Sequence, residues 1–356
     1  MQTVDDTLAD TLARHNALVR REIEAVLNAQ APSDPSDPFY GIIRYHLGLA
    51  GADLKPAVAH TGKGLRGALL LLVAQAFGGD ELATAPLAAA VELLHSFSLV
   101  HDDIEDGSPT RHHRATVWSL WGAPVGINTG DGLHALAHLA LYRSPLREED
   151  PRALLDVARA FDRATLRLAE GQHRDMALQD APDIAHVSVD DYLRMIDGKT
   201  ATLIGAAAAI GARAAGADAR QAARAERFGH KLGLAFQMQD DILGIWGDER
   251  VTGKSTVSDI TSRKKTLPLL LALAHGAPAD RERLRALYTR PGDDSETRDT
   301  RDILALLDRA GARDLTRDYL RRYREAAVQA LADTGLPEAA TAPLHAFERR
   351  FTERAA

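Results

Sequence analysis

Apolar residues recur at spacings of three and four along almost the whole chain, and this periodicity constrains its fold more than any other feature. Such spacing places apolar side chains on one face of an α-helix. Runs of alternating β-branched residues, which are typical of strands, are scarce, so we expect no credible sheet. The periodic Ala- and Leu-rich segments are residues 67–77, 87–101, 131–141, 153–170, 201–212 and 226–243. The sequence therefore predicts an all-α protein.

Turn-forming residues separate the helical segments. Ser188 and Asp191 have the spacing of a capping box, which predicts a helix that carries Tyr192 and Met195. None of the expected loops resembles a domain linker, so we expect one all-α domain, a helical bundle spanning residues 1–356. Within it, the more charged residues 281–356 are expected to form peripheral amphipathic helices. The expected loops are residues 31–38, 107–110, 122–128, 181–186, 247–258 and 290–300.

The composition excludes several classes of protein. The 356 residues are 45% hydrophobic and 26% charged, as in an ordinary globular chain. The absence of cysteine excludes disulfides, a thiol nucleophile and a thiolate metal site. A net charge of −7 argues against a nucleic-acid or anionic-membrane partner. Residues 1–13 lack the apolar core of a secretory signal, and 201–212 are too few to span a bilayer. We therefore expect a cytoplasmic protein without a membrane span.

Two of the five Asp-Asp pairs differ from the others because each ends an apolar helical segment. Asp102-Asp103 follows residues 93–100, and Asp240-Asp241 follows residues 232–238. Apolar flanks predict burial, and buried carboxylates are costly unless a positive group neutralises them. Asp102 and Asp106 lie one helical turn apart, where two carboxylates suit a hard cation such as magnesium. An alternative for either pair is a carboxylate cluster that is neutralised by nearby arginines.

Lysine is rare among the basic residues of this chain. Only seven of the 43 Lys and Arg residues are lysine, and five of these lie beside glycine or in a basic pair at an expected helix start. A compact cation at a helix start suits phosphate, although each such lysine taken alone is an ordinary surface residue. The five, with two arginines expected to act beside them, are Lys63, Lys199, Lys254, Lys264, Lys265, Arg66 and Arg111. Carboxylates for metal, cations for phosphate and apolar helix walls together predict a substrate with a diphosphate and a hydrocarbon chain.

An ordered set of short motifs runs from Lys63 to Pro268. The motifs are Gly62-Lys63-x-x-Arg66, His95, Leu99-Val100-His101-Asp102-Asp103-x-x-Asp106, Arg111, Gly130-Asp131, Gly171-Gln172-x-x-Asp175, Lys199-Thr200-Ala201, Phe236-Gln237-x-x-Asp240-Asp241, Gly253-Lys254, Asp259 and Lys264-x-Thr266-Leu267-Pro268. In order and spacing this set resembles the trans-isoprenyl diphosphate synthases, of the short-chain farnesyl and geranylgeranyl type. A single aspartate-rich motif would be a weak match, whereas the ordered set is specific.

The resemblance implies an all-α fold with a central cavity, a homodimer and three magnesium ions. It implies an enzyme that condenses an allylic prenyl diphosphate with isopentenyl diphosphate. The implied principal metal ligands are Asp102, Asp106 and Asp240, supported by Asp103 and Asp241. The implied groups for the allylic diphosphate are Arg111, Lys199, Lys254 and Gln237, with Lys264 also binding substrate. Isopentenyl diphosphate would be held by Lys63, Arg66 and His95, and Thr200 and Gln237 would face the reacting carbons.

The chemistry of such a site follows from its charges. Metal ions and cationic side chains draw negative charge from the allylic diphosphate, so that its C–O bond ionises and leaves an allylic cation. The isopentenyl double bond attacks this cation, and the released diphosphate takes the final proton. The protein holds both substrates in position and keeps out water, which would quench the cation.

Three positions depart from the family pattern. His112 stands where a second arginine is usual. The substitution is either simply tolerated or makes the binding of isopentenyl diphosphate stronger when the histidine is protonated. Gly244 replaces the third aspartate of a longer second motif, and Ala115 replaces a common proline, which we expect to affect only a loop. His101, His112, His113 and His173 lack the spacing of a zinc site.

Phe97 lies five residues before Asp102, about 7.5 Å back along a helix at 1.5 Å per residue. A ring at this distance would close the cavity beneath a growing prenyl tail, although an ordinary core phenylalanine is an alternative. The resemblance then favours geranylgeranyl diphosphate as product, with farnesyl diphosphate close behind. Two other functions stay open: a class I terpene cyclase, which ionises a single prenyl diphosphate, and a non-catalytic subunit of a heteromeric synthase.

Overall fold

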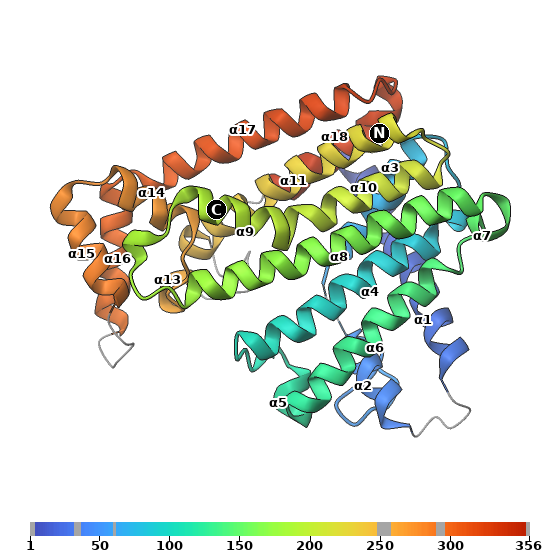
Figure 1. The fold of residues 1–356 in the computed structure, drawn as a ribbon, viewed down its shortest axis with the longest axis horizontal. Coiled ribbons are helices and arrows are strands. Elements are labelled where there is room, and N and C mark those ends of the chain that lie inside the picture. Colours follow the sequence, from blue (N-terminus) through green and yellow to red (C-terminus); the bar gives the residue numbers. More distant parts are fainter. Residues whose placement is uncertain (1–3, 32–36, 60–61, 248–257, 290–295, 354–356) are drawn as a thin grey trace. The chain divides into compact units, whose positions relative to one another are not determined.

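Helices make up nearly all of the computed structural model, which describes residues 4–31, 37–59, 62–247, 258–289 and 296–353 (Figure 1). The first elements are α1 (Val4–Gln30), α2 (Pro38–His46), α3 (Leu65–Ala76), α4 (Glu81–Glu105), β1 (Thr110–Arg111), β2 (Arg114–Ala115), α5 (Val117–Trp121), α6 (Ala123–Leu141), α7 (Leu146–Glu149) and α8 (Pro151–Gln179). The chain continues through η1 (Ile184–His186), α9 (Val189–Ile196), η2 (Asp197–Ala201), α10 (Thr202–Ala214), α11 (Ala219–Trp246), α13 (Ser258–Thr261), α14 (Leu267–His275), α15 (Pro278–Thr289), α16 (Glu296–Arg309), α17 (Ala312–Ala332) and α18 (Glu338–Thr352).

The chain forms two compact units. Unit 1 comprises Met1–Thr165, Ala206–Glu226 and Thr334–Ala346. Unit 2 comprises Leu166–Gly205, Arg227–Asp333 and Phe347–Ala356. The first aspartate motif belongs to unit 1 and the second to unit 2. The expected single domain over residues 1–356 stays a prediction.

Helix α4 lies at the heart of unit 1, where it packs against α1, α3 and α6 (Figure 1). The side chain of Asp80 caps its first turn by accepting the N–H of Ala83 at 2.8 Å. By length and composition α4 could cross a membrane, but 61% of its apolar window is buried inside the protein, as in a core helix. Gly130 lets α6 approach α4 closely, because a Cβ atom there would lie 2.2 Å from Nε2 of His101.

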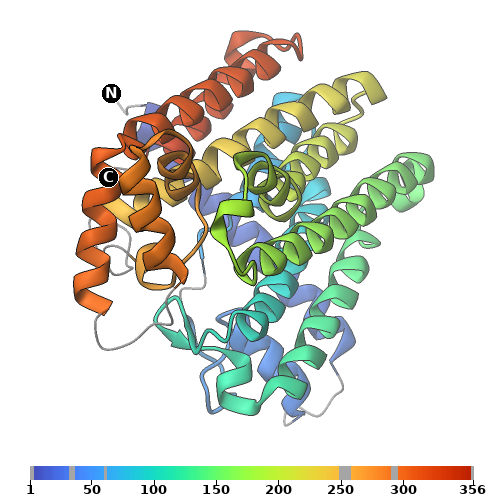
Figure 2. The same cartoon turned by 60° about the vertical axis from the view of Figure 1, so that its left-hand side comes forward.

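A short hairpin follows α4, so the expectation of no sheet is wrong at this point (Figure 2). Strands β1 and β2 pair antiparallel, with Thr110 opposite Ala115 and Arg111 opposite Arg114. Both turn residues, His112 and His113, have positive φ values of 50° and 60°. A two-residue turn of this hand usually carries Asn-Gly, and the His-His pair lacks that signal.

Local signals predicted most helices and some of the turns. Five of the six periodic segments lie wholly in helical elements, the segment 67–77 passes the end of α3 by one residue, and the capping box of Ser188 and Asp191 is confirmed. The loop expected at residues 122–128 is wrong, because α6 begins at Ala123 with Pro124 in its first turn, where proline is well tolerated. Residues 296–300, also expected as loop, belong to α16. The expected loop at 247–258 lies almost entirely outside the described residues.

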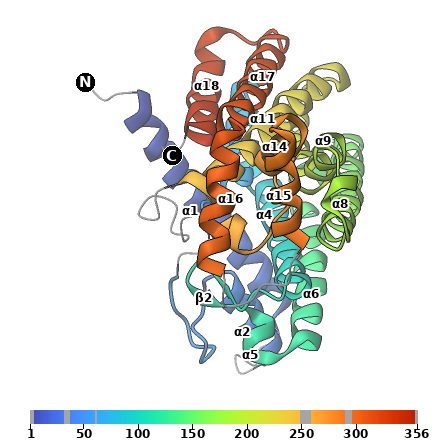
Figure 3. The same cartoon turned by 90° about the vertical axis from the view of Figure 1, so that its left-hand side faces the viewer.

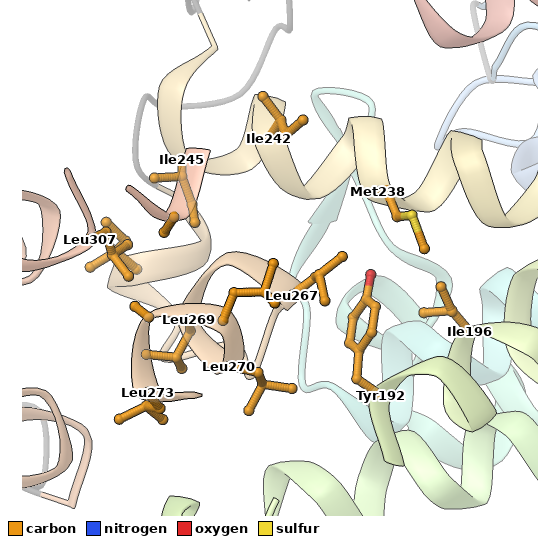
Figure 4. Close-up of a cluster of buried hydrophobic side chains, with 14 of the residues drawn as sticks. Tyr192, Ile196, Met238, Ile242, Ile245, Leu267, Leu269, Leu270, Leu273 and Leu307 are labelled. Atoms are coloured by element: carbon orange, nitrogen blue, oxygen red, sulfur yellow. The ribbon is translucent and has the colours of Figure 1, made fainter. Parts of the chain in front are cut away.

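Unit 2 has a core of its own, built around α14. Seven of the nine residues of α14 are buried, and they pack with Tyr192 of α9 and Met238 of α11 (Figure 4). Helices α15 and α16 lie beside α14 (Figure 3) and contribute Leu284, Leu287, Ile303, Leu306 and Leu307 to the same core. Each of these helices buries an apolar face in this core.

Candidate active site

The start of α3 carries Arg66 and is held by a residue of α4. Its N-cap, Gly64, has a φ of 56° and supplies no side-chain cap. Glu92 instead accepts the backbone N–H of Gly67 at 2.7 Å. Burial raises the pKa of Glu92, although this N–H and the charge of Arg66 oppose the rise. Sequence reasoning missed Glu92, whose only signal is its position one turn before His95 on α4.

Arg66 and His95 form a pair whose proton positions follow from chemistry. The guanidinium NH1 of Arg66 lies 3.0 Å from Nε2 of His95. Arginine only donates, so Nε2 accepts and the imidazole proton lies on Nδ1. Burial, together with Arg66 and Arg111, lowers the pKa of His95 well below its ordinary value. His95 is therefore a neutral hydrogen-bonding group, and the positive charge here comes from Arg66 and from the exposed Lys63.

A second histidine near these cations, His46 of α2, was not singled out from the sequence. Burial and the charges of Arg111 and Arg114 lower its pKa to about 3, so that it is neutral at pH 7. His112 is exposed at the tip of the hairpin, in the segment that carries both arginines. Unit 1 thus gathers arginines around neutral histidines.

Neighbouring aspartates of the first motif have different surroundings. Asp103 has a side chain that is only 2% exposed, and Nε of Arg111 donates to its Oδ1 at 2.7 Å. Burial raises the pKa of Asp103, and Arg111 opposes the rise. Asp102 is partly buried and Asp106, one turn later at the helix end, is exposed. Because successive helical residues point about 100° apart, Asp103 orients Arg111 while Asp102 and Asp106 share another face.

The ring of Phe97 lies between α4 and α6. Its centroid is 4.9 Å from the ring of His101 and 5.1 Å from that of His134. Phe97 is partly buried, so part of its surface is not covered by the helices of unit 1. Both of these ring neighbours are polar imidazoles.

In unit 2, Lys199 and Thr200 lie in a π-helical segment, η2, which connects α9 to α10. Nζ of Lys199 bonds to Oδ2 of Asp175 on α8 at 2.6 Å. The hydroxyl of Thr200 donates to Oε1 of Gln237 on α11 at 3.0 Å. The π segment thus directs two consecutive side chains to two different helices, a feature that no sequence signal predicted.

Two glycines permit this arrangement. A Cβ atom at Gly171 would lie 2.0 Å from the backbone nitrogen of Lys199, and one at Gly198 would lie 2.7 Å from the carbonyl oxygen of Arg167. The backbones of α8 and η2 are therefore in direct contact. This contact explains why Gly171 precedes Asp175 by one turn: the glycine allows the approach and the aspartate meets the lysine.

Asp241 is held inside unit 2 by three donors. Its Oδ2 accepts the hydroxyl of Tyr192 at 2.6 Å and the N–H of Leu267 at 3.0 Å, and its Oδ1 accepts Nε2 of Gln237 at 3.1 Å. Burial and the charge of Asp259 raise its pKa to about 7. Asp241 is only 3% exposed. Asp241 therefore accepts hydrogen bonds that fix the side chains of Tyr192 and Gln237 in place.

A steric constraint explains why glycine occupies position 244. A Cβ atom at this position would lie 2.1 Å from Oδ2 of Asp259. The glycine that replaces the third aspartate of the motif therefore makes room for another carboxylate from the segment that follows.

The two lysines that precede α14 differ. Lys264 is exposed. Lys265 is buried, and its Nζ donates to the carbonyls of Leu178 and Gln179 at 2.5 and 2.7 Å, which closes the C-terminus of α8. Burial lowers the pKa of Lys265. Lys254, which the sequence also singled out, lies outside the described residues.

Among the residues that the structure describes, no three His, Asp or Glu side chains are grouped closely enough to hold a metal ion. Asp102 and Asp106 of unit 1 provide hard carboxylate oxygens, as does Asp240 of unit 2, and magnesium completes its shell with water and substrate phosphates. Donors of this kind fit a divalent ion that binds together with a diphosphate.

Comparison with known proteins agrees with this chemistry. The sequence pattern of the polyprenyl synthetase family matches residues 52–307. A geranylgeranyl diphosphate synthase of Mycobacterium tuberculosis is 43% identical over 83% of this chain and 82% of that protein. A (2E,6E)-farnesyl diphosphate synthase of Mycobacterium bovis is 37% identical over 88% of this chain and 86% of that protein.

Solved structures have the same fold. A polyprenyl synthetase from Streptomyces coelicolor superposes with a TM-score of 0.88 and 36% identity, over 97% of this chain and 99% of that one. A polyprenyl synthase from Caulobacter crescentus, complexed with calcium and isoprenyl diphosphate, superposes with a TM-score of 0.78 and 30% identity, over 97% and 98% of the two chains.

Proposed function

The chain belongs to the polyprenyl synthetase family, and on this premise we propose that it is a short-chain isoprenyl diphosphate synthase. It condenses an allylic diphosphate with isopentenyl diphosphate. The proposed product is geranylgeranyl diphosphate, with farnesyl diphosphate second. Synthases of both products are relatives of this chain over most of its length. The Arg66–His95 pair carries the proposal. A second diphosphate needs positive charge in addition to the cations assigned to the first, and Arg66 supplies it.

We propose that Arg111 and Lys199 bind the allylic diphosphate. Arg111 is oriented by Asp103, and Lys199 by Asp175, so each cation is held before substrate arrives. When bound, magnesium, for which we propose three ions on Asp102, Asp106 and Asp240, draws negative charge from the diphosphate and promotes its departure. Asp103 and Asp241 support the site through the side chains that they orient, Arg111 and Gln237, and Lys254 and Lys264 add positive charge.

We assign Lys63, Arg66 and His95 to the binding of isopentenyl diphosphate. His112, in the turn of the hairpin, is assigned to the same substrate. Because His95 is neutral, it contributes a donor at Nδ1 rather than a charge.

The hydroxyl of Thr200 and the amide of Gln237 are hydrogen-bonded to each other. Their dipoles are proposed to face the reacting carbons and to stabilise the allylic cation.

The active form is proposed to be a cytoplasmic homodimer. The proposed cytoplasmic location is supported by the family, which consists of soluble enzymes, and by the burial of the apolar helix α4 inside the protein.

One assay tests the function. The purified protein is incubated with magnesium and dimethylallyl, geranyl or farnesyl diphosphate, with and without isopentenyl diphosphate. We expect chain elongation that requires both isopentenyl diphosphate and magnesium. Release of a hydrocarbon from a single prenyl diphosphate would indicate a terpene cyclase, and no turnover would indicate a non-catalytic subunit.

A further inference from the structure

The η2 segment needs support from outside itself. Its defining bond runs from the N–H of Thr202 to the carbonyl of Asp197, five residues apart, and the hydroxyl of Thr202 donates to the same carbonyl at 2.8 Å. Such π turns are rare because their hydrogen-bonded geometry is less favourable than that of an α-helix. The position of Lys199 and Thr200 therefore depends on contacts that η2 makes with neighbouring helices.

Helix α11 holds η2 at two points. Thr200 bonds to Gln237 near the end of the segment. Asp197, the first residue of η2, accepts Nε2 of His230 at 2.7 Å. His230 and Gln237 are seven residues apart, which is two turns along one face of α11. The two bonds thus fasten both ends of η2 to the same helix face.

Helix α8 adds a third contact. NH2 of Arg167 donates to Oδ2 of Asp197 at 3.1 Å. The bond from His230, the largest effect, and the charge of Arg167 lower the pKa of Asp197, so that its carboxylate stays ionised at neutral pH. Two donors from two helices therefore converge on one carboxylate at the beginning of η2.

The Asp197–His230 pair lies apart from the groups assigned to the substrate. Both residues line a cavity of about 450 Å³ in unit 2, together with Lys231 and Tyr323, and neither Lys199 nor Thr200 is among its lining residues. The side chains of Asp197 and His230 are 31% and 26% exposed. An effect of this pair on substrate must therefore pass through the backbone of η2.

We propose that Asp197 and His230 are positioning residues, whose hydrogen bond fixes η2 so that Lys199 and Thr200 are held ready for the allylic diphosphate. This inference rests on the proposed function, which assigns Lys199 and Thr200 to that substrate. Neither residue belongs to the motifs that the sequence singled out. The assignment concerns only the allylic side, because the groups assigned to isopentenyl diphosphate lie in unit 1.

The test compares two substitutions of His230. His230→Leu keeps bulk but removes the donor, and we expect the KM for the allylic diphosphate to rise about fivefold or more, the size of effect that a lost hydrogen bond typically produces. The KM for isopentenyl diphosphate should stay within about twofold. His230→Gln, whose amide can donate to Asp197, should restore the allylic KM. A general loss of stability would not separate the two KM values in this way.

Arg309→Gln is the matched control. It breaks the two-bond pair of Arg309 with Asp280, which is also in unit 2, and both KM values should stay as in the wild type. Asp197→Asn provides a second test of the pair, since it keeps the size of the side chain and removes its charge; it should raise the allylic KM as His230→Leu does.

Unchanged or equally raised KM values in both His230→Leu and Asp197→Asn would overturn the inference. Loss of folded protein in both would also overturn it, because the pair would then serve stability. Lys199→Ala separates this result from a failure of the proposed function. An unchanged allylic KM in Lys199→Ala would remove the assignment of Lys199 itself, whereas an impaired Lys199→Ala with a normal His230→Leu would remove only the positioning role.

Discussion

The carboxylate of Glu92 accepts the backbone N–H of Gly67 at 2.7 Å, so a partly buried side chain of α4 caps the first turn of α3. Helix α3 has no side-chain cap of its own at Gly64. Since His95 follows Glu92 by one turn, the same short stretch of α4 orders both Arg66 and its partner imidazole.

Replacing Glu92 should therefore weaken the binding of isopentenyl diphosphate. Glu92→Leu leaves the N–H of Gly67 unsatisfied, and we expect the KM for isopentenyl diphosphate to rise about tenfold, as the loss of a buried hydrogen bond would produce. Glu92→Gln keeps a carbonyl oxygen as acceptor and should stay close to the wild type. Initial rates at saturating allylic diphosphate measure both. Equal KM values for the Leu and Gln variants would contradict the capping role.

Asp102 and Asp103 should differ in their dependence on magnesium. Asp102→Asn removes a proposed ligand, and we expect the magnesium concentration for half-maximal activity to rise about tenfold or more. Asp103→Asn loosens Arg111 instead, so it should raise the KM for the allylic diphosphate and leave the magnesium requirement within about twofold. Magnesium titrations of the activity of the two variants distinguish these two roles. The separation of roles is wrong if both variants shift the magnesium curve equally.

Asp241 should make the stability of the metal-free protein depend on pH. Its pKa is about 7 in the folded chain, above the value of about 3.9 for an unfolded aspartate. The folded state therefore binds the proton more tightly, and the free energy of unfolding should fall as the pH rises from about 4 to about 7. Asp259→Asn removes the repulsion that helps to raise this pKa, so the decline should be smaller. Urea unfolding in EDTA at several pH values in this range measures how steeply the free energy of unfolding falls with pH. An equally steep fall in Asp259→Asn would contradict the role of Asp259 in raising the pKa of Asp241.

Phe97→Ala should lengthen the product distribution. The ring is packed against His101 and His134, and its removal opens space that a longer prenyl tail can enter. Chromatography of the extracted products measures the change. Phe39→Ala is the control, because that ring is 39% exposed on α2 and its loss should leave the distribution unchanged. Identical products from wild type and Phe97→Ala would remove the assigned role.

Family membership and the helical fold were predictable because their signals are short-range or ordered along the chain. Apolar spacing marks helices within a few turns, and the capping box of Ser188 and Asp191 lies within one turn. The aspartate motifs were recognisable by their order. Lys265 shows the limit of this reasoning: its basic pair suggested phosphate, whereas the structure places its ammonium on the backbone carbonyls that end α8.

The sequence by itself determined which helices form, in what order, and which family's chemistry the motifs indicate. Only the tertiary structure decided how adjacent residues of one motif divide their work. Asp241 meets Tyr192 across 49 residues of sequence, Thr200 meets Gln237 across 37, and Glu92 meets Gly67 across 25. Such hydrogen bonds join separate helices, so no local period or propensity encodes them. Burial then sets the charge state of each group, and burial is a property of packing rather than of sequence neighbours.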